Sequence, residues 1–211
     1  MRAVDGAIIV VDAVEAIMPQ TETVMRQALR ERVKPVLFIN KVDRLIKELQ
    51  LTPEQMQQRF INIITLANRL IQKYAEPEYA AKWLVKVEDG SVAFGSAYRK
   101  WAISVPYMRQ HNITFKDIID ASTKGDDKEL EKKAPLHNIL LTMVIRHLPN
   151  PKQAQPYRIP KIWHGDVTSD IGASMLETNS NGPLVMVVTK VVPDPHAGFV
   201  TAGRIFSGTI K

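Results

Sequence analysis

Hydrophobic positions near the start of the chain follow patterns that are typical of a parallel α/β sheet. The runs GAIIVVDA (6–13) and KPVLFIN (34–40) are short, apolar and β-branched, which predicts two strands buried on both faces. Between them, residues 19–33 place apolar side chains at helical spacing after Pro19, which suits a helix start. The order strand, helix, strand predicts a right-handed βαβ unit.

The next segment predicts a long amphipathic helix with a defined start. Thr52 is expected as the N-cap, Pro53 at the first helical position, and Gln55 where a capping box requires Glu or Gln. Pro77 ends the helical pattern. The apolar stripe that we expect to pack on the sheet consists of Met56, Phe60, Ile63, Ile64, Ala67, Leu70, Ile71 and Tyr74.

Three further segments complete the first part of the chain. SVAFGSAY (91–98) predicts a third strand that runs into a Gly-Ser-Ala turn, and residues 98–110 are predicted to be helical up to Pro106. The mixed-charge residues 124–133 are predicted to be a solvated loop or a short helix. Pro135 is expected to start the last helix. Its inward side chains would be those of Leu136, Ile139, Leu140, Met143, Val144 and His147.

A change of composition divides the chain. Four of the 13 prolines lie between Leu148 and Lys161, which indicates a linker. We therefore predict an α/β domain over residues 1–149, a linker and domain junction over 150–182, and the first strands of a second domain over 183–211.

The last of these regions has the pattern of β-structure. PLVMVVTKVV (183–192) and GRIFSGTIK (203–211) predict two strands joined by PDPHAGFVTA, without a helix between them. This arrangement indicates a hairpin or a fragment of an antiparallel barrel. The predicted fold class is thus α/β, with a partial parallel sheet and helices, followed by the start of an antiparallel β-barrel domain.

Composition and charge narrow the classes of function. The 211 residues are 45% hydrophobic and 24% charged, which is an ordinary globular balance. The net charge of +6 is spread along the chain and is compatible with an RNA-rich partner. Because there is no cysteine, disulfides, thiolate metal sites and cysteine nucleophiles are excluded. The apolar run Ala7–Val11 is too short for a membrane or secretory segment, so we expect a cytoplasmic protein.

Polar residues directly after the second strand form a candidate binding loop. In parallel α/β sheets, ligands bind beyond the carboxyl ends of the strands, where Asn40, Lys41 and Asp43 stand. The Asp43 carboxylate suits N1–H and N2–H of guanine, whereas adenine lacks both donors and would leave it unpaired. Lys41 could lay its stem over the base, and Asn40 could brace the neighbouring loops. A backbone N–H of the Ser96–Ala97 turn could donate to guanine O6.

A second interpretation of the same residues is purely structural. Asn, Lys and Asp often end a strand and cap the helix that follows. The strand before Asn40 and the later Gly95-Ser96-Ala97 after a third strand both favour the guanine site. A third interpretation is that the chain is an unrelated α/β protein in which Asn-Lys-x-Asp occurs by chance.

Long colinear stretches of the chain resemble the translation elongation factor 2 family of GTPases, and its archaeal members most of all. The matching stretches are AVDGAIIVVDAVEAIMPQTETVMRQALRERVKPVLFINKVDRLIKELQL, EDGSVAFGSAYRKWAISVP, APLHNILLTMVIRHLPNP, YRIPKIWHGD and DPHAGFVTAGRIFSGTIK. Two residues depart from the pattern of the family. Ala16 stands where the family usually has Gly, and Tyr98 stands where the wider GTPase class often has Lys.

The resemblance implies a function and a set of site residues. It implies that Asn40, Lys41 and Asp43 read the base of GTP or GDP, with Ser96 and Ala97 as the companion loop. No catalytic or metal-ligating residue is implied in this chain, and Mg²⁺ is expected in the parent factor only. The implied function is GTP-driven translocation, the movement of tRNA and mRNA on the ribosome. Ribosomal RNA and the acidic stalk protein are the implied partners.

Segments that the family uses for phosphate chemistry do not occur in this sequence. There is no Gly-x-x-x-x-Gly-Lys-Ser/Thr loop to hold phosphates, no switch segment and no Asp-x-Pro-Gly-His. We therefore expect an internal fragment of a larger factor that does not hydrolyse GTP by itself. Exposed strand edges lead us to expect self-association, swapped strands or a disordered tail after about Asn181. The alternative function is a non-catalytic module that binds the ribosome or its stalk protein.

Overall fold

The computed structural model describes residues 1–210, which divide into two compact units. The first, here called the sheet unit, comprises residues 6–30 and 34–148. The second, here called the hairpin unit, comprises residues 1–5, 31–33 and 149 onward. Each unit therefore combines segments that are separated in the sequence.

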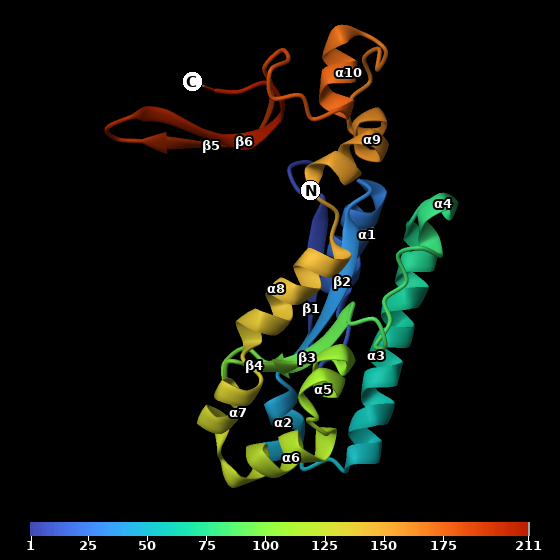
Figure 1. Ribbon diagram of the computed structural model, residues 1–211, viewed down its shortest axis with the longest axis vertical. Helices are drawn as coiled ribbons and strands as arrows, with labels where there is room; N and C mark the ends of the chain where they lie inside the picture. Colours follow the sequence, from blue (N-terminus) through green and yellow to red (C-terminus); the bar gives the residue numbers. More distant parts are fainter. Residues whose placement is uncertain (211) are drawn as a thin grey trace. The chain divides into compact units, whose positions relative to one another are not determined.

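A four-stranded sheet forms the centre of the sheet unit (Figure 1). Its strands are β1 (Gly6–Asp12), β2 (Lys34–Asn40), β3 (Val92–Ser96) and β4 (Trp101–Ile103), in that spatial order. The first three strands are parallel, and β4 pairs antiparallel with β3. The carboxyl ends of β1, β2 and β3 consequently lie at one edge of the sheet.

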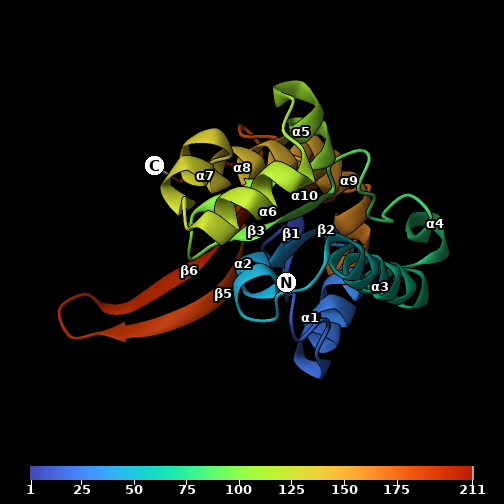
Figure 2. The ribbon, with the colours of Figure 1, turned by 90° about the horizontal axis from the view of Figure 1, so that it is seen from below.

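Helices cover both faces of this sheet (Figures 1 and 2). α1 (Pro19–Arg30) and α3 (Pro53–Tyr74) pack on one face, and α8 (Leu136–His147) packs on the other. Alternate residues of each strand point to opposite faces, so each helix meets its own set of apolar side chains. The core on the α8 face consists of Val36, Phe38, Ala93, Ala102, Ile139 and Met143.

The capping prediction for α3 is confirmed. Thr52 Oγ1 accepts a hydrogen bond from the Gln55 N–H at 3.3 Å, and Gln55 Oε1 accepts one from the Thr52 N–H at 2.9 Å. Of the predicted stripe, Ile64 and Tyr74 are only partly buried. The buried members are Met56, Phe60, Ile63, Ala67, Leu70 and Ile71.

The prediction that residues 98–110 are helical up to Pro106 is wrong. Trp101–Ile103 form the buried strand β4, and helix α5 (Val105–His111) begins where the predicted helix was expected to end. Pro106 lies in the first turn of α5, where a missing N–H costs nothing. Three buried apolar residues in a row fit an edge strand against β3 better than one face of a helix.

Short helices connect the larger elements of the sheet unit. They are α2 (Val42–Lys47), α4 (Pro77–Ala80), α6 (Phe115–Lys124) and α7 (Asp127–Lys133). The short-helix alternative for residues 124–133 is therefore confirmed. Gly125 closes α6 with a φ of +82°, a left-handed conformation that glycine adopts without a steric penalty.

β1 is an edge strand of the described sheet, and the prediction that it is buried on both faces is wrong. Ile9 and Val11 are buried against the helices of one face, but Val10 on the other face is 54% exposed. An edge strand has a neighbour on one side only, so its outer face is covered less completely than that of β2.

In the hairpin unit, the proline-rich segment that we predicted as a linker is helical. α9 (Pro151–Ile162) begins with a capping box between Asn150 and Gln153, and it includes Pro156 and Pro160. Each internal proline removes one backbone hydrogen bond, so side-chain packing has to hold the helix. α10 (Asp170–Leu176) follows, so the prediction that α8 is the last helix is also wrong.

An antiparallel hairpin ends the described chain. β5 (Val185–Asp194) pairs with β6 (Gly198–Ser207), which begins five residues earlier than predicted. Asp194 Oδ1 accepts hydrogen bonds from the N–H groups of His196 and Ala197, each at 2.8 Å, and so defines a short turn. The predicted fold class is confirmed: a parallel α/β sheet is followed by an antiparallel hairpin.

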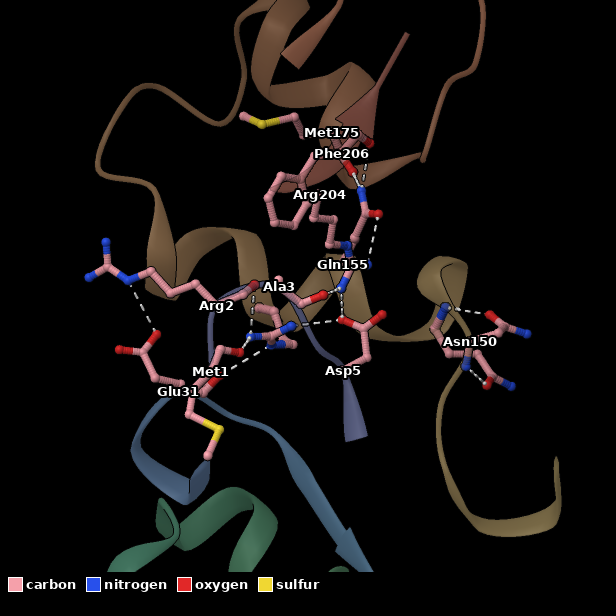
Figure 3. Close-up of polar contacts among 12 residues, drawn as sticks. Met1, Arg2, Ala3, Asp5, Glu31, Asn150, Gln155, Met175, Arg204 and Phe206 are labelled. Atoms are coloured by element: carbon pink, nitrogen blue, oxygen red, sulfur yellow. Dashed lines mark hydrogen bonds and ion pairs between the residues drawn. The ribbon is translucent and has the colours of Figure 1, made fainter. Parts of the chain in front are cut away.

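A buried cluster of ion pairs around Asp5 holds the segments of the hairpin unit together (Figure 3). The Arg158 side chain is fully buried and lies 2.8 Å from Asp5 Oδ1, and Arg204 lies 2.6 Å from the same oxygen. Arg158 also donates to the backbone carbonyls of Glu31 and Met1, both at 3.1 Å. One carboxylate and several carbonyl dipoles thus balance two guanidinium groups.

No helix within residues 1–210 is both long and apolar enough to cross a membrane.

The replacement Asp5→Asn tests the buried cluster of ion pairs around Asp5. It leaves two sheltered guanidinium groups without a counter-charge, so we expect the hairpin unit to lose about 3 kcal/mol of stability. Native-state hydrogen exchange of α9 amides would report this loss, with α3 amides as the internal reference. Glu177→Gln, which neutralises an exposed carboxylate of the same unit, is the control. Equal protection of α9 in both variants would contradict the assignment.

Candidate functional site

The predicted site residues lie where the three parallel strands end. Asp12 ends β1, Asn40 ends β2 and Ser96 ends β3, and Asp12 is opposite Asn40 in the sheet register. The Ala13 N–H donates to the Asn40 carbonyl at 2.8 Å, so the chain segments that leave β1 and β2 stay together. This is the edge at which open α/β sheets bind their ligands.

The Asn40 side chain joins the two predicted loops. Its Oδ1 accepts hydrogen bonds from the Lys41 N–H at 2.8 Å and from the Ala97 N–H at 2.9 Å. Residues 57 positions apart are thereby held in one site. The Ala97 N–H is consequently engaged, and donation from it to guanine O6 would require this bond to be shared or exchanged.

Lys41 occupies a strained backbone position. Its φ of 62° and ψ of 32° are left-handed, which costs a non-glycine residue roughly 1 kcal/mol. The bond to Asn40 and an ion pair at 2.8 Å between Lys41 Nζ and Asp12 Oδ2 hold this conformation. The sharp turn brings Asp43, in the first turn of α2, back toward the edge of the sheet.

Asp12 is a counter-charge that the sequence analysis did not single out. Burial raises the pKa of its carboxyl, but the hydrogen bonds from Lys41 and from the Val14 and Glu15 N–H groups outweigh burial. The net pKa of Asp12 is therefore lowered, and the group stays ionised at neutral pH. In the sequence, Asp12 is marked only by its place at the end of the first predicted strand.

The Asp43 carboxylate is sheltered but keeps its capacity to accept hydrogen bonds. The side chain is only 13% exposed, and its Oδ2 lies 3.8 Å from Arg99 Nε. That distance is too long for a hydrogen bond, so the lone pairs of the carboxylate stay available. A carboxylate of this kind fits the paired N1–H and N2–H donors of guanine.

A further set of charges lies behind Asp43. Arg99 Nη1 lies 3.2 Å from Asp127 Oδ2, and Lys47 Nζ lies 2.9 Å from the same oxygen. The Arg99 N–H also donates to Ser96 Oγ at 3.2 Å. Arg99 comes three residues after Ser96, but no sequence spacing connects Asp127 to the site. The structure thus brings all five predicted residues together and adds Asp12, Lys47, Arg99 and Asp127.

Comparison with known proteins identifies the family of this part of the chain. A protein-family model described as "Elongation factor Tu GTP binding domain" matches residues 1–150, which include both loops. The elongation factor 2 of Thermococcus kodakarensis is 67% identical over 211 residues, that of Thermococcus sibiricus 66%, and that of Pyrococcus horikoshii 64%. These matches cover 100% of this chain and 29% of each relative.

The predicted resemblance to archaeal elongation factor 2 is confirmed by these identities. The chain spans less than a third of the length of the curated relatives that it matches. The family match covers more than half of the chain, from β1 through α8, and includes every residue of the site described above. This chain belongs to the family of the elongation factor Tu GTP binding domain.

Proposed function

We propose that this chain carries the guanine-recognition part of a translational GTPase. The observation that carries the proposal is the Asn40 bridge, which holds the loop of Lys41 and Asp43 against the Ser96–Ala97 turn. A sheltered carboxylate with free lone pairs stands beside this bridge. The ligand is the base of GTP or GDP.

Each side chain then has a chemical role. Asp43 accepts from N1–H and N2–H of guanine and discriminates against adenine, which offers neither donor. The Lys41 stem covers the face of the base, while its ammonium stays on Asp12. The Ser96–Ala97 turn lies next to O6, where the Ala97 N–H shares its hydrogen bond between Asn40 and the base.

We propose GTP hydrolysis for the complete factor and not for this chain alone. The sequence has no phosphate loop, and the transfer of a phosphoryl group depends on positioning and charge at the phosphates. Base contacts alone should give an affinity of about millimolar. Mg²⁺ is proposed for the larger factor only, and none of the five site residues is assigned to it. Measurable GTP turnover by the purified chain would contradict this assignment.

The name of the relatives supports a proposal for the biological role. Since they are named elongation factor 2, we propose that the complete factor acts in translation elongation. From the family resemblance, we also propose that it acts in the cytoplasm and promotes the movement of tRNA and mRNA. The ribosome is then the partner, through its RNA and its acidic stalk protein, and the net charge of +6 suits RNA. Self-association through the open edge of β1 stays a prediction, supported by the exposure of Val10.

A second candidate function is a ribosome-binding or stalk-binding module without nucleotide chemistry, which the positive charge also favours. The replacement Asp43→Asn distinguishes the two candidate functions. If the chain is only a binding module, Asp43→Asn will leave the amount of chain that pellets with ribosomes unchanged. The chain will also show no preference for guanine nucleotides.

Asp43→Asn is the direct test of base recognition. The amide removes the charge and replaces one acceptor with a donor, so we expect the preference for GDP over ADP to fall at least about tenfold. NMR shift titrations measure affinities in the expected millimolar range. Asp120→Asn, an exposed carboxylate on α6, is the matched control. A preference that survives Asp43→Asn would refute the proposed site.

The ion pair between Asp12 and Lys41 gives a pH-dependent prediction. Because the pKa of Asp12 is lowered, its stabilising effect is complete above the ordinary value of 3.8 and is lost as the pH falls through the lowered value. We expect the carboxyl ¹³C signal of Asp12 to titrate below 3.8, and Lys41→Met to move its midpoint upward. A midpoint at or above 3.8 in the unchanged chain would contradict the pairing.

A further inference from the structure

Four charged side chains of alternating sign lead away from the proposed base-reading carboxylate. Asp43 Oδ2 lies 3.8 Å from Arg99 Nε, Arg99 Nη1 lies 3.2 Å from Asp127 Oδ2, and Lys47 Nζ lies 2.9 Å from Asp127 Oδ2. We call these four residues the charge network. Of the four, Arg99, Asp127 and Lys47 were not among the residues predicted from the sequence.

The charge network connects three elements that are distant in the sequence. Asp43 and Lys47 belong to α2, Arg99 to the turn between β3 and β4, and Asp127 to the start of α7. α2 and α6 lie side by side, and Gly125 turns the chain from α6 into α7 (Figures 1 and 2). The segment of helices after β4 therefore reaches the loop that reads the base.

Arg99 is held from two directions. Its side chain pairs with Asp127, and its backbone N–H donates to Ser96 Oγ within the companion loop. The guanidinium group is planar, so the pairing of Nη1 with Asp127 also restricts where Nε can lie. The charge next to Asp43 consequently has a defined location.

Two buried polar atoms in the charge network lack a hydrogen-bond partner among residues 1–210: Arg99 Nε and Asp127 Oδ1. Buried atoms of this kind lower stability, so the arrangement is poorly explained as a device for stability alone. The position of Arg99 does affect the Asp43 carboxylate. At 3.8 Å, Arg99 attracts Oδ2 electrostatically without occupying its lone pairs.

We propose that Arg99 is a positioning residue that orients the Asp43 carboxylate toward guanine, and that Asp127 acts through Arg99. The inference rests on the proposed function, because it deepens the role of the same site. Both oxygens of Asp43 have to face the base to accept from N1–H and N2–H together. Arg99 fixes the rotation of the carboxylate, and Asp127 fixes Arg99.

Inosine diphosphate separates a positioning role from a structural one. Hypoxanthine keeps N1–H but lacks the 2-amino group, so it makes one of the two hydrogen bonds to Asp43. The ratio of GDP affinity to inosine diphosphate affinity therefore measures how well the carboxylate is oriented. A variant that merely loosens the fold weakens both nucleotides by the same factor and leaves the ratio unchanged.

The experiment is an NMR titration of the complete 211-residue chain with GDP, inosine diphosphate and ADP. We expect Arg99→Ala to lower the ratio of GDP to inosine diphosphate affinity roughly threefold to tenfold, as for coupled residues of one network. Arg99→Lys restores the charge without the planar fork, so it should fall between the unchanged chain and Arg99→Ala. Arg69→Ala, an exposed arginine on α3, should keep the original ratio.

The variant Asp127→Asn is an independent test, because it leaves Arg99 itself unchanged. It should lower the ratio less than Arg99→Ala does, and the double variant should be no worse than Arg99→Ala alone. Should Arg99→Ala fail to fold, Arg99→Lys and Asp127→Asn still carry the test. Effects of Asp127 and Arg99 that simply add would show that Asp127 does not act through Arg99.

The outcomes separate the two levels of the proposal. If the unchanged chain does not prefer GDP to ADP, the proposed guanine site itself is wrong. If it prefers GDP but Arg99→Ala keeps the ratio of GDP to inosine diphosphate affinity, the positioning role is wrong and the site stands. A fall of both affinities by one factor would equally overturn the positioning role.

Discussion

Parallel strands cannot be joined by a tight turn, and this constraint organises the sheet unit. β1 and β2 each have to be followed by a connection that returns to the opposite end of the sheet, so β1, β2 and β3 all end at the same edge. The polar residues that terminate the strands are thereby collected without any direct attraction between them. Asn40 then converts this proximity into a bonded arrangement by accepting from the Ala97 N–H.

The strain at Lys41 follows from the same geometry. A chain that leaves a buried strand and enters a short helix within two residues has to reverse sharply, and the left-handed conformation provides that turn. The surrounding bonds to Asn40 and Asp12 offset its cost. Strain and hydrogen bonding at this position are consequently two aspects of a single turn that places Asp43.

Local rules in the sequence were sufficient for part of the fold. α3 was predictable because its cap, its proline and its stripe agree with one another. β4 was missed because a short apolar run does not distinguish a strand from a helix. α9 was missed because its prolines indicated a linker, although Asn150 and Gln153 form a capping box in the structure. In both cases tertiary packing decided between two locally acceptable structures.

The site shows the same division between local and distant information. Asn40, Lys41 and Asp43 are predictable because their spacing and position after a strand are local features. Arg99 and Asp127 are not predictable, because the fold alone brings α7 next to the turn after β3. Charges supplied by a later segment carry no periodicity and no motif.

The ion pair of Lys41 with Asp12 also bears on the entropy of binding. A lysine that becomes ordered only when a ligand arrives loses about 0.5–1.5 kcal/mol of rotamer freedom at that moment. Here the ammonium is already held at 2.8 Å, and the side chain is still 51% exposed to solvent. The ion pair therefore restricts the lysine in the absence of any ligand, yet its stem remains accessible. For the proposed guanine ligand, this part of the conformational freedom is lost during folding and does not have to be removed again.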